Sequence, residues 1–125
     1  MVRTLKLAPI LGAVTTPVDI NPFPLGAIAP TSGTLLPVLN NYPNLAQRSA
    51  KVLTFYAPPT NQGTVYVGGT GLVRATLTGV LLMIDPGETK ALPFNGSGGN
   101  TIDLSKFYVD VDTTGDKALV DALYA

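Results

Sequence analysis

The chain has 125 residues, with 8 basic and 8 acidic side chains and a formal net charge of zero; this length fits one domain. Cysteine and histidine are absent, which excludes disulfides, thiol nucleophiles and histidine-based catalysis or metal binding. Without a basic excess to neutralise phosphates we expect no nucleic-acid partner, and without a long apolar run we expect no membrane partner. Charged residues are only 13% of the chain, a low share that suggests a surface covered in an assembly.

The first 47 residues are apolar, rich in proline and almost free of charge. Their only charged side chains are Arg3, Lys6 and Asp19. Proline at close spacing forbids a long helix and interrupts sheet ladders, whereas the apolar composition is unlike that of a solvated linker. The sequence therefore predicts an extended N-terminal arm over residues 1–47, followed by a compact β domain over residues 48–125.

An apolar extended arm needs a surface to lie on, and two alternatives stay open. The arm either wraps its own domain or lies over neighbouring subunits. In the second case its larger apolar side chains are the candidate partner contacts: Phe23, Leu25, Ile28, Leu35, Leu36 and Tyr42. Arg3 and Lys6 before a short apolar run look like a secretion signal, but Pro9 interrupts that run and no good cleavage site follows, so we expect no signal peptide.

Beyond residue 48 the sequence alternates short strand-like runs with turns. In residues 49–57, for example, Leu53 and Phe55 alternate with more polar positions, which is typical of a half-buried strand. Residues 118–124 favour a strand, a hairpin partner of the one before it, over a helix. The predicted strands are residues 49–57, 64–67, 80–84, 88–94 (an edge strand or a strand end because of Pro93), 106–112 and 118–124. Short strands at this spacing predict an all-β fold, a small antiparallel sandwich or barrel that is jelly-roll-like.

A glycine cluster and several acidic residues are the candidate chemical sites. Gly68–Gly71 lacks the lysine of a phosphate-binding loop and a following helix, so we interpret it as a structural turn. Asp110, Asp112 and Asp116 lie in a partial match to a calcium-binding loop. Threonine at the fifth position and strand-like flanks favour a solvated strand face that ends in a turn at residues 113–116.

Two carboxylate pairs have the composition of a glycoside hydrolase site. They are Asp85 with Glu88 and Asp110 with Asp112. The chain contains no tryptophan to form a sugar platform, and residues 85–87 are explained by a turn. We therefore expect no catalytic residues, no metal, no cofactor and no enzymatic activity.

Four segments occur in an order that resembles a known family. They are Gly63–Gly69 (GTVYVGG), Asp85–Thr89 (DPGET), Asp103–Asp112 (DLSKFYVDVD) and Gly115–Val120 (GDKALV). This pattern resembles small structural proteins of tailed-bacteriophage virions, of the capsid decoration, cement or head-fibre type. The resemblance covers residues 48–125, and Ala118 and the loop at residues 95–100 depart from it.

The resemblance implies a function without catalysis. It implies a decoration or cement protein on the outer capsid surface of the virion, which binds the major capsid protein, stabilises contacts between capsomers and forms a homotrimer. The alternative is a fibre-base or tail adhesion module that binds host carbohydrate through an exposed aromatic residue, Tyr66 or Tyr108. An arm of about 45 residues spans more than roughly 100 Å when extended, enough to bridge neighbouring subunits.

Overall fold

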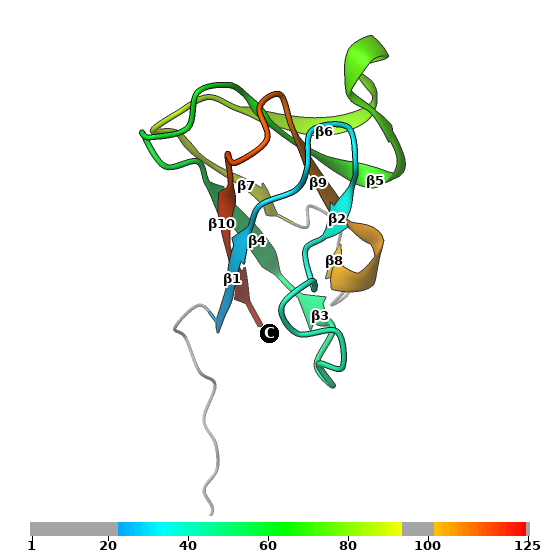
Figure 1. Ribbon diagram of the computed structural model, residues 1–125. Coiled ribbons are helices and arrows are strands. Elements are labelled where there is room, and N and C mark those ends of the chain that lie inside the picture. The colour runs from blue at the N-terminus through cyan, green and yellow to red at the C-terminus, as the bar shows by residue number, and fades with distance from the viewer. Residues whose placement is uncertain (1–22, 94–101, 125) are drawn as a thin grey trace, which may run out of the picture.

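Two four-stranded antiparallel sheets face each other in the computed structural model, which describes residues 23–93 and 102–124 (Figure 1). The first sheet has the strand order β1-β10-β4-β7 and the second has the order β2-β9-β5-β6. Their strands are β1 (Phe23–Ile28), β2 (Leu36–Pro37), β4 (Val52–Tyr56), β5 (Val65–Val73), β6 (Thr78–Ile84), β7 (Thr89–Pro93), β9 (Tyr108–Val111) and β10 (Ala118–Leu123). A small third sheet pairs β3 (Ser49–Ala50) with β8 (Ile102–Asp103), and the short 3-10 turns are η1 (Arg74–Thr76) and η2 (Leu104–Lys106).

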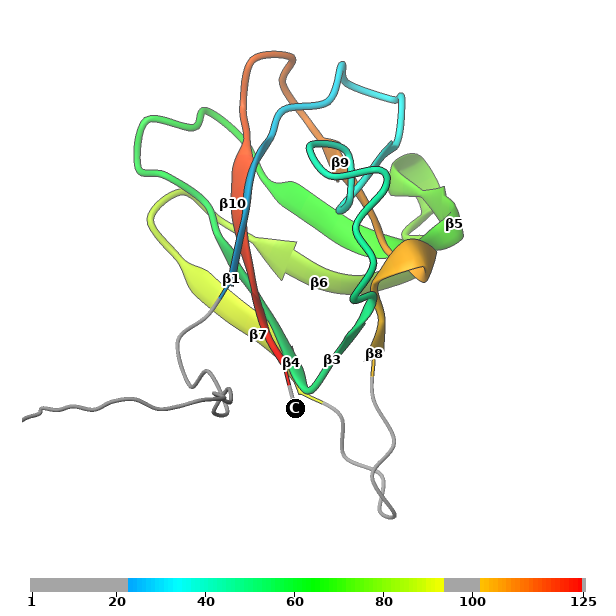
Figure 2. The ribbon, with the colours of Figure 1, turned by 90° about the horizontal axis from the view of Figure 1, so that it is seen from below.

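The pairing of the strands is nested. Strand β1 pairs with β10, β2 with β9, β4 with β7 and β5 with β6, all antiparallel. The chain thus resembles one long hairpin, with its tip between β5 and β6, which is rolled up so that β10 also pairs with β4 and β5 with β9. Figure 2 shows the two layers from below. This nesting defines a jelly roll, and the predicted all-β antiparallel sandwich is confirmed.

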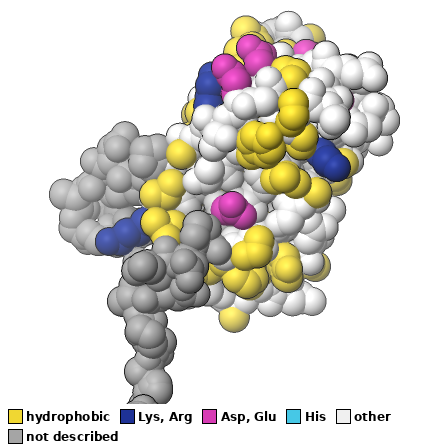
Figure 3. All heavy atoms as spheres, turned by 90° about the vertical axis from the view of Figure 1, so that its left-hand side faces the viewer, with side chains coloured by type: hydrophobic (Ala, Val, Ile, Leu, Met, Phe, Trp, Pro, Cys, Tyr) yellow, Lys and Arg dark blue, Asp and Glu magenta, His cyan; other side chains and the backbone are white. Residues whose placement is uncertain are grey.

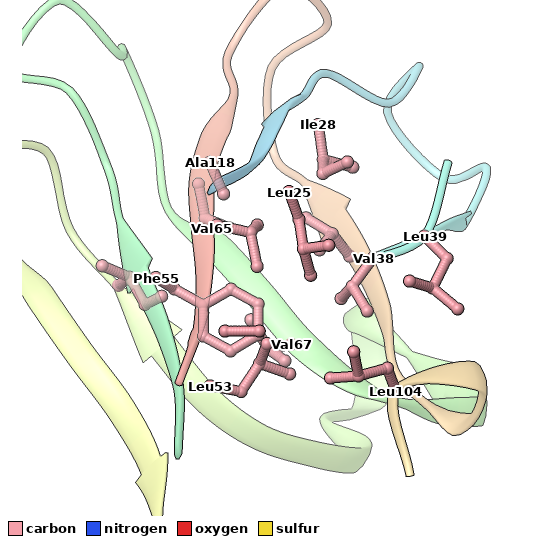
Figure 4. Packing of buried hydrophobic residues seen from close by; sticks show 14 of the residues in the cluster. Leu25, Ile28, Val38, Leu39, Leu53, Phe55, Val65, Val67, Leu104 and Ala118 are labelled. Carbon is pink, nitrogen blue, oxygen red and sulfur yellow. The ribbon is translucent and has the colours of Figure 1, made fainter. Parts of the chain in front are cut away.

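The core lies between the sheets and follows from strand alternation. On β4, Leu53 and Phe55 are fully buried while their neighbours are partly exposed. Val65 and Val67 of β5 face them from the second sheet and belong to the same cluster (Figure 4). Each such side chain contributes roughly 1.5–3 kcal/mol when it leaves water, so the alternating pattern is the main determinant of which face of each strand lies inside.

Residues 23–47 belong to this sandwich, which corrects the expected division at residue 47. Strand β1 pairs with β10 from Phe23↔Ala122 to Ile28↔Ala118. Leu25 is fully buried in the core, as is Ile28. Of the two alternatives for the arm, this part wraps its own domain. Residues 1–22 lie outside the described residues.

The glycine cluster at residues 68–71 is not a turn, contrary to its interpretation from sequence. It lies inside β5, and the chain reverses only at η1 and Leu77. A Cβ atom at Gly68 would lie 2.1 Å from the carbonyl oxygen of Gly79, so glycine permits a close approach of β5 and β6 here. The register of the two strands shifts on both sides of Gly68.

The last strand also differs from its prediction in one respect. Residues 118–123 form a strand as expected, but β10 pairs with β1 and β4, and its predicted hairpin partner β9 lies in the other sheet. The turn at Gly115, with φ +103°, therefore carries the chain from one sheet to the other. The predicted edge position of β7 is confirmed.

Side chains cover carbonyl groups at two sheet edges. The Asn41 side chain donates to the Leu25 and Ala27 carbonyl oxygens at 3.0 and 2.9 Å, beside the irregular pairing of β1. Lys90 Nζ donates to the Met83 carbonyl oxygen of β6 at 2.7 Å. Capping of this kind makes an edge less available to a foreign strand.

Candidate functional site

The six candidate contacts of the arm lie in different environments. Leu25 and Ile28 are in the core, while Phe23 and Leu36 are partly buried against it. Leu35 is half-buried. Tyr42 exposes 40% of its surface, and its ring meets that of Phe23 edge-on with centroids 5.4 Å apart. The structure therefore does not bring these side chains together as one contact surface.

A cluster of polar side chains joins three separate segments at Arg74. Arg74 Nη1 donates to Asp112 Oδ1 at 2.9 Å and Nη2 donates to Ser32 Oγ at 3.1 Å. Its Nε lies 3.4 Å from Asp110 Oδ2, an ion-pair distance without hydrogen-bond alignment. The hydrogen bond to Asp112 and the two nearby carboxylates raise the pKa of Arg74. The hairpin tip, the β1–β2 loop and β9 are thus held together by one guanidinium.

Asp110 is buried, although its alternating position on the strand predicted an outward side chain. It is only 3% exposed. Its Oδ1 accepts hydrogen bonds from the backbone N–H groups of Gly33 and Val111 at 2.9 and 2.8 Å. Strand alternation placed it on the outer face of the second sheet correctly, but the β1–β2 loop and Arg74 cover that position.

The other carboxylates of the partial calcium loop also accept hydrogen bonds from the protein. Asp116 accepts from the backbone N–H groups of Gln62 and Gly63 at 2.9 and 2.8 Å. Asp112 Oδ2 accepts from the Tyr66 hydroxyl at 3.3 Å, and burial together with this carboxylate raises the pKa of Tyr66. Within residues 23–93 and 102–124, no group of three or more acidic side chains has a geometry that could hold a metal ion.

Tyr66 and Tyr108 are the aromatic candidates for carbohydrate binding. Tyr66 is only 8% exposed, so its ring offers little area for a sugar to stack on. Tyr108 is partly exposed at the start of β9.

The surface of the described residues includes at least two pockets. One, of about 270 Å³, lies beside the ion pair and is lined by Gly33, Leu72, Val73, Arg74, Ala75 and Asp110. The other, of about 230 Å³, is lined by Pro37, Leu39, Asn40, Pro43, Arg48 and Ser105. We call the second one the Leu39 pocket. Arg48 stabilises the rim of this pocket, because its side chain donates hydrogen bonds to the carbonyl oxygens of Pro43 and Leu45 at 2.6 and 2.8 Å.

The outward face of the first sheet is apolar, which the alternation of an ordinary solvated sheet does not predict. Its central positions pair as Leu119↔Tyr56, Asp121↔Thr54 and Leu123↔Val52. Asp121 is therefore the only charge on the two central strands of this face, and Leu119 is 39% exposed. Figure 3, which looks onto this side, shows two patches of hydrophobic side chains with an acidic side chain between them.

A second apolar surface lies on the β5–β6 hairpin. Of the six large hydrophobic side chains that are exposed in the described residues, four belong to it: Val73, Leu77, Leu81 and Met83. Sequence reasoning missed this surface, because a short run of apolar residues such as 80–84 indicates a buried strand. It also missed Arg74, because no local pattern places residue 74 beside residue 110.

The fold and these surfaces define a small jelly-roll protein with apolar outer surfaces. In the described residues, no helix has the length and apolar character needed to cross a membrane. No known protein family, no curated protein and no solved structure matches the chain.

Proposed function

We propose that the chain is a structural protein of a tailed-bacteriophage virion that decorates the outer capsid surface. In this role it binds the major capsid protein and stabilises contacts between capsomers, as a homotrimer and without catalysis. The order of the four sequence segments supports the proposal. A jelly roll hosts many functions, so the observation that carries the proposal is the apolar outward face of the first sheet.

The geometry of this face suits a flat protein partner. Leu119 and Tyr56 lie opposite each other across the pairing of β10 and β4, and aromatic side chains supply much of the energy of many interfaces. Asp121 lies one outward row further along. A single carboxylate within an apolar face meets a donor or a basic group of the partner and thereby fixes the orientation of the complex.

Residues 1–22 supply a second contact in this proposal. Their only charged side chains are Arg3, Lys6 and Asp19, and they lead into Phe23, the first residue of the edge strand β1 of the same sheet. A stretch of 22 residues spans up to roughly 70 Å when extended, well beyond one domain. Extended segments bind at sheet edges through main-chain hydrogen bonds, so this segment would bind a neighbouring capsid subunit.

The experiment measures binding of the purified chain to phage heads that lack it, by co-sedimentation. We expect Leu119→Lys to lose binding at least tenfold, because it places a charge in the contact, while circular dichroism shows an unchanged fold. Thr60→Lys, a loop position that is also exposed, is the matched control and binds normally. Equal binding by Leu119→Lys and the wild type would refute the role of this face.

A truncation tests the segment before β1. Removal of residues 1–22 leaves Leu25 and Ile28 in place, whereas a cut at residue 40 would remove these core side chains and β1. We expect the truncated chain to fold and to bind heads weakly. Labelling of intact particles at the tail instead of the head would contradict the proposal and favour the alternative, a carbohydrate-binding adhesion module.

A further inference from the structure

Leu77 adopts a backbone conformation that a leucine rarely adopts. Among the residues that the structure describes, it is the only one other than glycine with positive φ, at φ +60° and ψ +22°. This left-handed region crowds the Cβ atom of an ordinary residue against the backbone, and asparagine or glycine occupies it more readily. The conformation is required because residue 77 ends η1 and reverses the chain into β6.

Packing of the Leu77 side chain does not offset this backbone strain. It is 51% exposed, and η1 beside it contains no buried residue. Val73, which precedes η1, is 47% exposed as well. An observed backbone outlier of this kind is a reasonable starting point for a hypothesis of function. A leucine that serves neither the turn nor the core is explained if it contacts a partner.

The hairpin tip, defined as residues 73–78, projects from the body of the sandwich at the top of Figure 1. It is also anchored, because Arg74 within it is bonded to Asp112 and Ser32. Its one charge is therefore neutralised within the chain. The tip presents two apolar side chains from an anchored base, so little conformational entropy is lost when it docks.

The chain also carries a recess of matching size and character. The Leu39 pocket measures about 230 Å³ and contains three apolar lining residues, Pro37, Leu39 and Pro43. An apolar cavity of roughly 150 Å³ already holds a benzene molecule, so the four-carbon side chain of Leu77 fits. The pocket is lined mainly by the loop after β2, and this loop lies well below the hairpin tip in Figure 1, so the two segments are separate within one copy.

We propose that the hairpin tip of one copy inserts Leu77 into the Leu39 pocket of a second copy. A contact between two different surfaces of the same chain is heterologous and generates a ring if the rotation closes. This contact supplies the subunit interface for the homotrimer in the proposed function. Its test needs no capsid, so it can fail while capsid binding holds, and the reverse is equally possible.

Because the chain contains no cysteine, disulfides in a crosslinking test can form only between introduced cysteines. Ala75→Cys, an exposed position of the tip that leaves Leu77 in place, and Asn40→Cys are prepared separately, mixed and mildly oxidised, and the products are identified by mass spectrometry. We expect a disulfide between the two variants at high yield. Leu119→Cys mixed with Asn40→Cys is the control for random collision, because Leu119 is also exposed. A yield no higher than in this control would overturn the proposal.

Two further variants separate the contact from folding. Leu77→Asn suits the left-handed conformation, so we expect the monomer to melt at the wild-type temperature or a few degrees higher, while light scattering shows at least a tenfold loss of association. Asn40→Phe, which fills the pocket from an exposed position, should lose association equally, whereas Leu77→Met should keep it. A monomeric wild-type chain, or a Leu77→Asn variant that still associates, would overturn the inference.

Discussion

Replacement of Gly68 by alanine tests the close approach of β5 and β6. The added Cβ atom would lie 2.1 Å from the Gly79 carbonyl oxygen and 2.9 Å from Leu72 Cδ1. Ordinary contacts begin near 3.4 Å, so the two backbones must separate by more than an ångström. Overpacking of this kind costs about 1–3 kcal/mol. Loss of one or two neighbouring ladder hydrogen bonds adds about 1 kcal/mol each.

We therefore expect Gly68→Ala to lower the free energy of unfolding by about 2–5 kcal/mol. Gly71→Ala is the matched control, because it lies in the same strand with nothing within 4 Å of its added Cβ atom and no positive φ. That variant should be unchanged or stabilised by about 0.5 kcal/mol, since alanine restricts the unfolded chain.

Urea unfolding followed by circular dichroism measures both variants against the wild type. The shift of the midpoint is converted with an unchanged m-value, which also checks that the unfolding stays two-state. If Gly68→Ala loses less than about 1 kcal/mol, or no more than Gly71→Ala, then the contact does not restrict residue 68 and the reasoning fails.

Three further predictions concern charged and hydroxyl groups. Arg74→Met leaves Asp110 buried without its cation, and we expect urea unfolding to show a loss of stability of about 2 kcal/mol. This is below the full figure for a buried pair, because the Arg74 side chain is 29% exposed and Asp110 keeps its two backbone donors. A loss of stability under about 0.5 kcal/mol would contradict this reasoning. The Ser105 hydroxyl and then its backbone N–H hold the pKa of Asp103 below its usual value. The Asp103 carboxylate therefore stabilises the fold above about pH 4, and this stability is lost as the pH falls through the folded pKa. Asp103→Ala should have a lower melting temperature than the wild type at neutral pH and the same melting temperature in strong acid. A difference in melting temperature that does not depend on pH would contradict this role of Asp103. Burial and Asp112 raise the pKa of Tyr66, so the contribution of Tyr66 to stability is complete below about pH 10 and is lost as the pH rises through the folded pKa. Tyr66→Phe should therefore remove part of the loss of stability at alkaline pH. Identical alkaline melting curves for the variant and the wild type would refute this role of Tyr66.

Alternation was enough to predict the central strands. On β4, Leu53 and Phe55 are buried at every second position, and this pattern is local. The sequence did not predict strand β1, because proline and glycine, here Pro24 and Gly26, disfavour the interior of a strand. Its pairing shifts register between these two residues, and its partner β10 lies about a hundred residues away in sequence. Long-range pairing of this kind leaves no local pattern.

The side-chain clusters were less predictable than the strands. The sequence places Asp110 and Asp112 on one strand face, but the position of Arg74 next to them depends on how β5 and β9 pair. Glycine at position 68 was interpreted as a turn residue, since turns are its most frequent role. In this fold the same residue allows two backbones to approach, which only the register of β5 and β6 reveals.

The nested pairing has a consequence for the order of events during synthesis. Strand β10 follows the other described strands in sequence, yet it lies in the interior of the first sheet, between β1 and β4. Until it leaves the ribosome, β1 has no partner and Phe55 lacks its neighbour Val120. The first sheet can therefore close only after β10 has emerged, and the chain carries unpaired apolar strands until then. Sandwiches dominated by such distant contacts fold in milliseconds to seconds, a period in which a ribosome-bound chaperone has time to bind.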